Sequence, residues 1–352
     1  MFDLDCWLVT SYDLAVDVLR DPDTFTVDHP GFSTQQVIGP SMLSLDGAAH
    51  RLHRDPFAVP FRLQRIRSNV APWIRGRATE LVQSVEASGQ ADLRRAVARP
   101  LAVETMAHVL GLEGIDGDQL AAWYEEIVDA VDSVTMGRGV TSSGTAAFGA
   151  LSTAVIASLD TSPLLRMVVT GSELSPEAVA SNVAVLLFGG IVTGDGTNSL
   201  VVQHLLEGDG LLNRIAEDPS LVPAFVEESL RIEPAAAAVD RFATRGVALG
   251  GASIPAGDLV RVSLAAANRD PAVFPNPDVL DIDRANSGRH LTFARGPHSC
   301  LGIHLARAEA MAVVEAVVTG LTQPKLVEDR AVAPEGLVFR GLKRVPVNWR
   351  PR

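Results

Sequence analysis

The sequence predicts a mainly α-helical protein with small β elements. A long apolar helix pattern begins after Ser175 and continues to Leu206. Helical periodicity also runs through much of residues 46–133, whereas strand-like patterns are confined to 238–264 and the C-terminal tail. The chain has 352 residues, of which 47% are hydrophobic, so one large core can form.

Composition and charge exclude several classes of protein. The net charge of −12 argues against nucleic acid as a general partner. The longest fully apolar run, 183–192, is far shorter than a membrane span, and the N-terminus does not resemble a signal peptide. Cys6 and Cys300 are too few for a disulfide framework, which fits a reducing cytoplasm. Because the sequence has no internal repeats and no linker-like stretches, residues 1–352 are expected to form a single domain, located in the cytoplasm and without a membrane partner.

The first half of the chain is expected to be helical after one short strand. Residues 7–21 are typical of a strand followed by a helix that ends before Pro22. Two helices rich in arginine are expected over 46–57 and 61–87, and apolar helical periodicity continues through 93–133.

The middle of the chain contains the strongest helix signal. Residues 136–174 are rich in Gly, Ser and Thr, and one more helix is expected there, near 147–160. Ser175 can then cap a helix, and Pro176 suits its first turn. That helix spans about 30 residues, or roughly 45 Å, which is long enough to cross the whole molecule.

The last third of the chain mixes helices with short strands. The expected elements are helices at 211–217 and 220–232, strands within 238–264, an ordered meander at 268–299, a helix over 303–321 and a closing hairpin at 336–349.

One of the two cysteines lies in the loop FARGPHSCLG, residues 293–302, immediately before a helix. A helix N-terminus favours a thiolate through its dipole and free N–H groups, and Gly302 leaves room for a flat ligand. Taken alone, Cys300 can be a buried structural thiol, a nucleophile with His298 as its base, or a metal ligand. The loop by itself leaves these interpretations open.

This loop resembles the haem-binding loop of the cytochrome P-450 family, whose pattern is Phe-x-x-Gly-x-His-x-Cys-x-Gly. All five specified positions match: Phe293, Gly296, His298, Cys300 and Gly302. The resemblance implies that Cys300 is the axial thiolate ligand of haem iron, and that Phe293 and Gly302 adjoin the cofactor. A thiolate ligand favours O–O cleavage. The implied cytochrome P-450 fold has a long central helix over the distal haem face and the cysteine-ligand loop on the proximal face.

Further motifs match the family in the same order along the chain. Glu228 and Arg231 in EESLR are spaced i, i+3 on one helix face, and alone they would indicate a surface ion pair. The family has a buried, structural Glu-x-x-Arg here, joined by a later arginine for which Arg284 stands at the matching place. By the same resemblance, four side chains from separate segments bind the haem propionates: His50, Arg54, Arg241 and His298.

The long helix contains LFGGIVTGDGTNS, with four glycines in eight residues. Each glycine costs about 1 kcal/mol relative to alanine in a helix, so we interpret the segment as locally opened backbone close to a ligand. The family pattern, Ala/Gly-Gly-x-Asp/Glu-Thr, is matched by Gly190 and by the catalytic threonine Thr193. Val192 stands in the place of the acid. Asp195 follows about 200° further around the helix, so it should face elsewhere.

The resemblance implies a bacterial, soluble haem-thiolate monooxygenase that contains haem b and uses O2 and two electrons to oxidise a small lipophilic substrate, such as a secondary metabolite. Electrons are expected from NAD(P)H through ferredoxin reductase and ferredoxin. Seven arginines within 51–77 suit an acidic ferredoxin, but also an ordinary solvated helix face. Alternatives are an oxidase for coupling or peroxide-dependent oxidation, and a non-catalytic haem or partner protein. The family's usual N-terminal helix is expected to be missing.

Overall fold

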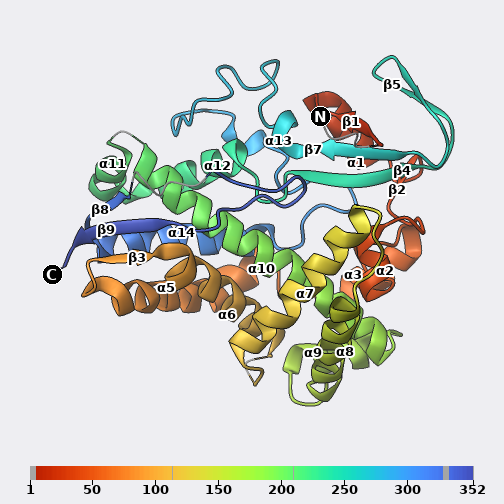
Figure 1. Cartoon of the computed structure of the whole chain (residues 1–352), viewed down its shortest axis with the longest axis horizontal. Coiled ribbons are helices and arrows are strands. Elements are labelled where there is room, and N and C mark those ends of the chain that lie inside the picture. The colour runs from red at the N-terminus through yellow and green to blue at the C-terminus, as the bar shows by residue number, and fades with distance from the viewer. Residues whose placement is uncertain (1–4, 113, 209, 328–332, 352) are drawn as a thin grey trace.

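A computed structural model of the chain describes residues 5–351 apart from 113, 209 and 328–332. Its helices surround one long central helix, α10 (Pro176–Glu207), and its strands form small, separate sheets (Figure 1). The predicted mainly α-helical class with small β elements is therefore confirmed.

In chain order, the elements before α10 are β1 (Trp7–Val9), α1 (Tyr12–Arg20), β2 (Phe25–Thr26), α2 (Ser33–Ile38), α3 (Gly47–Ala58), α4 (Leu63–Arg65), α5 (Ala71–Glu86), β3 (Gln90–Asp92), α6 (Arg99–Leu110), α7 (Gly117–Thr135), α8 (Ser142–Ala157) and α9 (Pro163–Gly171). Of these elements, helices α3, α6, α7, α8 and α9 pack against α10, whereas β1, α1 and β2 lie against strands and a helix that follow it in the chain. Short π-helical segments precede α5 and α6.

The elements after α10 complete the core and the sheets. They are α11 (Leu211–Glu217), α12 (Val222–Ile232), β4 (Ala238–Ala243), β5 (Val247–Leu249), β6 (Ala252–Ile254), β7 (Leu259–Ser263), α13 (Leu264–Ala267), α14 (Ile303–Gly320), β8 (Thr322–Leu326) and β9 (Pro346–Arg350). One sheet has the order β1-β7-β4-β2, another the order β3-β9-β8, and β5 pairs with β6 as a hairpin. Gly250 and Gly251 turn that hairpin with φ angles of 55° and 85°, where glycine is favoured.

Two parts of the chain differ from the prediction. Residues 136–174 hold two helices instead of one, because Thr141 caps α8 and Ser162 caps α9 through side-chain hydrogen bonds to backbone N–H groups. The tail does not fold back on itself as a hairpin. Its strand β9 pairs with β8 and β3, which lie beside it, and Glu335 and Gly341 form only an isolated bridge. The helix α2 was also not anticipated.

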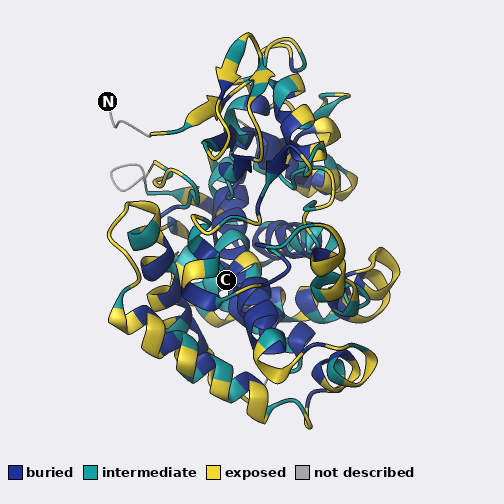
Figure 2. Ribbon diagram, turned by 90° about the vertical axis from the view of Figure 1, so that its right-hand side faces the viewer, coloured by how far each residue is buried: buried dark blue, intermediate teal, exposed yellow. Residues whose placement is uncertain are grey.

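Helix α10 is the centre of the core. Ser175 caps it as predicted, its side chain accepting from the backbone N–H of Ala178. The helix is continuous through its glycine-rich segment, so the expected local opening is not present. Among the described residues it is the one helix long and apolar enough to span a membrane, yet most of it is buried inside the protein (Figure 2). Burial by neighbouring elements accounts for its apolar sequence.

Candidate active site

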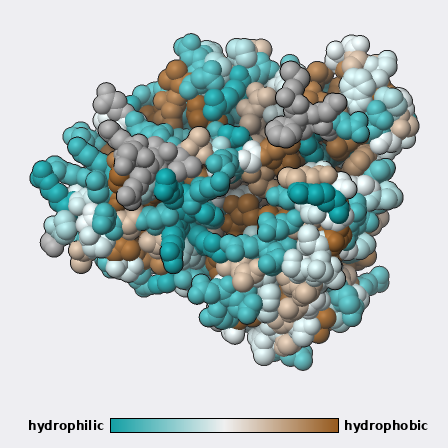
Figure 3. Space-filling model, in the orientation of Figure 1, coloured by the Kyte–Doolittle hydropathy of each residue, from teal (hydrophilic) through white to brown (hydrophobic). Residues whose placement is uncertain are grey.

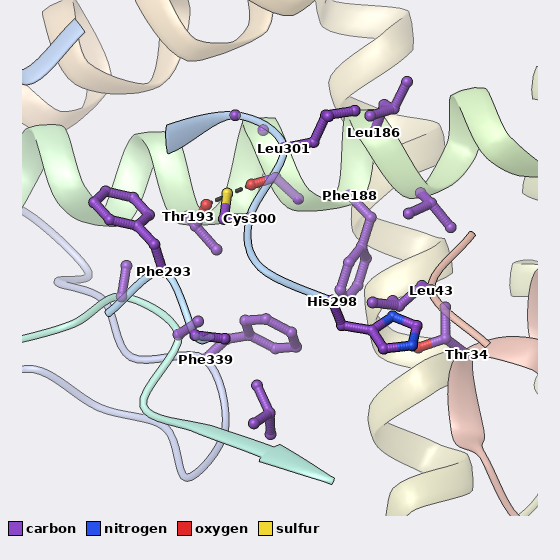
Figure 4. A pocket seen from close by; sticks show the side chains of 18 of the residues that line it. Thr34, Leu43, Leu186, Phe188, Thr193, Phe293, His298, Cys300, Leu301 and Phe339 are labelled. Carbon is purple, nitrogen blue, oxygen red and sulfur yellow. Dashed lines mark hydrogen bonds between the residues drawn. The ribbon is translucent and has the colours of Figure 1, made fainter. Parts of the chain in front are cut away.

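A cavity of about 310 Å³ lies between α10 and the loop that leads into α14. Its walls are mostly apolar and come from segments far apart in the sequence (Figure 4). On the face of the molecule drawn in Figure 3, apolar side chains are visible in a recess surrounded by polar ones. A cavity of this size and character is typical of a small-molecule site.

The Cys300 loop forms one wall of the cavity. The loop is closed by a hydrogen bond from the Cys300 N–H to the Phe293 carbonyl at 2.9 Å. Gly296 has a φ of 76°, and a Cβ atom there would lie 2.3 Å from the Leu19 carbonyl oxygen, so this position requires glycine. The Cys300 thiol has an accessible surface, yet burial raises its pKa. Both facts hold because the thiol faces an internal cavity instead of bulk solvent.

Helix α10 forms the opposite wall. Thr193 lines the cavity and its hydroxyl donates to the Gly189 carbonyl (Figure 4). A Cβ atom at Gly189 would meet nothing within 4 Å, so this glycine is open towards the cavity. Gly190 also lines the cavity, but a Cβ atom there would lie 2.2 Å from the Met106 sulfur of α6. Glycine is therefore required at 190 because α10 and α6 pack closely there. The sequence pattern alone does not distinguish this helix packing from the close approach of a ligand.

Val192 and Asp195 lie on another side of α10. Both line a second cleft instead of the cavity. The Asp195 carboxylate accepts hydrogen bonds from Arg94 at 2.7 and 3.0 Å and from Ser199 at 3.2 Å. The expectation that Asp195 faces away from Thr193 agrees with this geometry.

Two arginines of the expected propionate set line the cavity without an anionic partner. The Arg54 guanidinium donates to the Ser299 carbonyl at 2.6 Å, and that of Arg241 donates to the Asp240 carbonyl at 2.7 Å. Among the described residues, neither forms an ion pair. Burial lowers the pKa of Arg241 to about 10 and lowers that of Arg54. A buried guanidinium is stable only when its donors are satisfied, so this wall suits an anionic ligand group.

The two histidines of the set lie together beside these arginines. The rings of His50 and His298 are 4.3 Å apart, and His298 Nε2 lies 2.7 Å from the Asp46 carboxylate. The other nitrogens, His50 Nε2 and His298 Nδ1, are buried and have no hydrogen-bond partner in the part of the chain that the structure describes. Burial, followed by the charge of His298, lowers the pKa of His50 to about 4. Both rings therefore have a free position.

Among the acids that line the cavity and that the sequence reasoning missed, Glu309 of α14 is the most deeply buried. It is only 2% exposed, and the Asn198 side chain of α10 donates to its Oε2 atom at 3.1 Å. Burial raises the pKa of Glu309 to about 8, so the carboxyl group holds a proton at neutral pH. The sequence feature that could have identified Glu309 is an acid within the otherwise mostly apolar helix stretch AEAMAVVEAVV.

The structure also brings Glu228, Arg231 and Arg284 together. The Arg231 guanidinium donates to both Glu228 carboxylate oxygens at 2.7 and 2.8 Å, and Arg284 Nε donates at 2.9 Å. The side chains of Glu228 and Arg231 are fully buried, and that of Arg284 is 6% exposed. The set is thus a buried ion cluster in the core and not a surface pair.

Comparisons with known proteins agree with this geometry. The family profile of cytochrome P450 matches residues 161–321. The cytochrome P450 monooxygenase PikC of Streptomyces venezuelae is 32% identical over 98% of this chain and 86% of its own length. The chain belongs to the cytochrome P450 family. It is accordingly a P450 monooxygenase, an oxidoreductase whose family cofactor is haem.

Other relatives of this P450 are bacterial enzymes of similar length. The vitamin D(3) 25-hydroxylase of Pseudonocardia autotrophica is 31% identical over 98% of the chain and 88% of its own length. The steroid C26-monooxygenase of Mycobacterium tuberculosis is 29% identical over 97% and 94%. The crystal structure of P450BioI with a fatty-acyl-ligated acyl carrier protein has a TM-score of 0.88, at 27% identity over 98% of this chain and 92% of that one. The P450 fold is confirmed.

The residues around the cavity fit haem. A thiol, two guanidinium groups without ion pairs and His298, with its free Nδ1 atom, adjoin one apolar cavity, and the His50 ring packs behind His298 without lining the cavity. Haem is a flat apolar molecule with an iron that takes a thiolate and with two carboxylates that need cationic partners. These side chains supply each of those contacts.

Proposed function

We propose that this P450 is a haem-thiolate monooxygenase of the cytoplasm that binds haem b through the Cys300 thiolate and oxidises a small lipophilic substrate. The observation that carries the proposal is the placement of Cys300 and Thr193 in the same cavity, with Arg54, Arg241 and His298 in its wall. Arg54, Arg241, His50 and His298 would hold the propionates. Phe293 and Gly302 would flank the ligand loop, and the whole chain would form a single haem domain.

When bound, haem supplies the chemistry of O2 activation. The overall reaction combines the substrate, O2, two electrons and two protons to give an oxygenated product and water. The chain orients these reactants. The apolar wall excludes water from the substrate, and the Thr193 hydroxyl, now bonded to the Gly189 carbonyl, is placed to hydrogen-bond a ligand in the cavity.

The two protons must come from solvent, one at a time, through an ionisable side chain that is reprotonated after each transfer, and Val192 cannot relay them. We assign this role to Glu309. Its carboxyl group is protonated at neutral pH, lines the same cavity as Thr193, and is oriented by Asn198. Asp195 is the weaker candidate because Arg94 holds its carboxylate in the second cleft.

Electrons would come from NAD(P)H through ferredoxin reductase and ferredoxin. Of the seven arginines within 51–77, Arg54 faces the cavity and Arg77 pairs with Glu104 and Glu80. The others are exposed: Arg51, Arg62, Arg65, Arg67 and Arg75. Arg67 and Arg75 lie on residues 66–70 and on α5, which pack on α14, and α14 starts directly after the Cys300 loop. A basic surface there suits an acidic ferredoxin.

The substrate is expected to be lipophilic. The middle of the cavity is lined by apolar side chains such as Val185, Leu186, Phe188 and Phe339, and the Phe188 and Phe339 rings meet edge to face at 4.9 Å. The relatives named as steroid and vitamin D(3) enzymes, and the mycinamicin IV hydroxylase/epoxidase of Micromonospora griseorubida, support this proposal.

The test is spectroscopic and catalytic. The reduced protein with carbon monoxide should show the red-shifted Soret band of a thiolate ligand, and Cys300→Ala should abolish it whereas Cys6→Ser should not. Turnover with ferredoxin, its reductase and NADPH should give oxygenated product. A thiolate spectrum without turnover would indicate a non-catalytic haem protein, and a thiolate spectrum in Cys300→Ala would refute the ligand assignment.

Val192 favours a second candidate, an oxidase that uses peroxide or couples substrates and so needs less proton delivery. Hydrogen peroxide already carries the two electrons and two protons. If this candidate is correct, peroxide alone should support product formation at a rate at least equal to that with ferredoxin.

A further inference from the structure

The cavity has a polar end, formed where helices α2 and α7 pack against each other. Two hydroxyl-bearing residues of α2, Ser33 and Thr34, line it. On α7, Asp132 and Thr135 do so from the last turn of the helix. These side chains are hydrogen-bond acceptors as well as donors, and Asp132 adds a negative charge.

Asp132 differs from the other acids that line the cavity. Asp240 is paired with Arg261 at 2.7 Å, and Glu309 is protonated and bonded to Asn198. Among the described residues, the Asp132 carboxylate has no ion pair and no side-chain hydrogen bond. Partial burial of the side chain, followed by the charge of Asp129, raises the pKa of Asp132.

The cationic side chains that line the cavity lie near the Cys300 loop and not on α7. Arg54 and His298 adjoin the Cys300 loop, and Arg241 lies on β4 beside them. A substrate in the cavity would therefore have apolar walls along its body and one unpaired carboxylate at the α7 end. Asp132 is an exposed residue that also lines the cavity, so its carboxylate lies at the rim, where it can attract a cationic group while the apolar body is bound inside.

We propose that Asp132 recognises a cationic group of the substrate, so that the natural substrate is a lipophilic amine. Its ammonium group would pair with the Asp132 carboxylate and donate to the neighbouring hydroxyl oxygens of Thr34 and Thr135. Its apolar body would lie against Val185 and Phe188 of α10. This inference rests on the proposed function, because it takes the cavity as the substrate site.

The probes are three ligands with the same twelve-carbon chain: dodecyltrimethylammonium, 1-dodecanol and dodecanoate. The quaternary ammonium cannot coordinate iron or donate a hydrogen bond, so it reports the effect of charge alone. Binding to the haem-loaded protein is measured by the shift of the Soret band and, independently, by equilibrium dialysis. The cation should bind most tightly, dodecanol less tightly and dodecanoate least tightly.

Asp132→Asn keeps the size of the side chain and removes its charge. It should weaken binding of the cation by roughly 2-fold to 5-fold, as expected for an exposed charge pair, and leave dodecanol binding unchanged. The matched control is Asp118→Asn, which removes a charge from the first turn of the same helix, at a position that lines neither the cavity nor the second cleft. This control should leave all three affinities unchanged.

The outcomes separate the inference from the proposed function. If the wild type binds the cation no better than dodecanol, or if both variants weaken binding of the cation equally, recognition by Asp132 is refuted. The carbon monoxide spectrum is recorded for each protein first. A thiolate spectrum without cation preference overturns only the inference, whereas a wild type that lacks this spectrum overturns the proposed function.

Discussion

Glu309 of α14 accepts a hydrogen bond from Asn198 of α10 at 3.1 Å, and so joins the two helices that flank the cavity. A Cβ atom at Gly194 would lie 3.3 Å from the same Glu309 oxygen. The carboxyl group therefore lies against the helix segment that carries Thr193. An acid of α14 is thereby placed beside the part of α10 that carries Thr193, whereas on α10 itself the residue next to the threonine is Val192.

Glu309→Gln should impair proton delivery. The amide is similar in size and can still bond Asn198, but it cannot donate an acidic proton. Positioned acids typically contribute about 10²–10⁴-fold to a proton-transfer step, so product formed per NADPH should fall at least about 10-fold while peroxide release rises. Asp195→Asn is the control, and it should change coupling less. Equal coupling in wild type and Glu309→Gln would remove Glu309 from the mechanism.

The same variant should change how stability depends on pH. Burial raises the pKa of Glu309 from 4.5 to about 8 in the folded protein. The stability that this proton confers is fully present below about pH 4.5 and is lost as pH rises to about 8, because ionising the buried carboxyl disfavours folding. Urea unfolding should therefore show wild type losing stability relative to Glu309→Gln between pH 5 and 8. Parallel pH curves would show that Glu309 is ionised in the folded state.

Glu228→Gln should destabilise the core. The change removes the charge that Arg231 and Arg284 share, and it leaves buried guanidinium groups without compensation. Breaking a buried pair in this way costs about 3–5 kcal/mol, so the urea midpoint and haem content should both fall. Asp283→Asn is the matched control, because its pair with Arg214 is half exposed and should contribute less than about 1 kcal/mol. Similar midpoints in the two variants would contradict a special role for Glu228.

Arg241→Leu and Arg54→Leu should weaken haem binding. Arg241 is buried and Arg54 half-buried in the cavity wall, and neither guanidinium has an ion pair among the described residues, so each is available to a propionate. A charge-assisted hydrogen bond of about 1.5–3 kcal/mol corresponds to roughly 10-fold or more in haem affinity. Transfer of haem to apomyoglobin measures the loss. Arg51→Leu, at an exposed position on α3, should release haem at the wild-type rate.

The sequence predicted much of this architecture because its signals are local. The cap at Ser175, the helix over 303–321 and the EESLR spacing each depend on neighbours within a few residues. The failures depend on distant packing. Nothing near Gly190 in the sequence shows that Met106 lies against it, and the tail gives no sign that β8 is its partner. Glu309 was missed for the same reason, since its importance follows from the helix opposite it.

Val192, the residue next to Thr193, does not line the cavity. Val192 lines the second cleft, near the Arg94–Asp195 pair, so a carboxylate placed at 192 would face Arg94 instead of the cavity. Val192→Asp should therefore fail to improve coupling, although it restores the family pattern in sequence.

Thr193→Ala should have a moderate effect. The Thr193 hydroxyl lines the cavity but donates to the Gly189 carbonyl, and it has no acid on its own helix that faces the same way. If Glu309 supplies the protons, Thr193→Ala should lower coupling less than Glu309→Gln does, and the double variant should resemble Glu309→Gln, because residues that act in one relay are not additive. Product, NADPH consumption and peroxide are compared for all four proteins on one substrate. A gain of coupling in Val192→Asp, or a double variant whose loss is the product of the single losses, would instead mean that the acid position on α10 and the threonine work independently of Glu309.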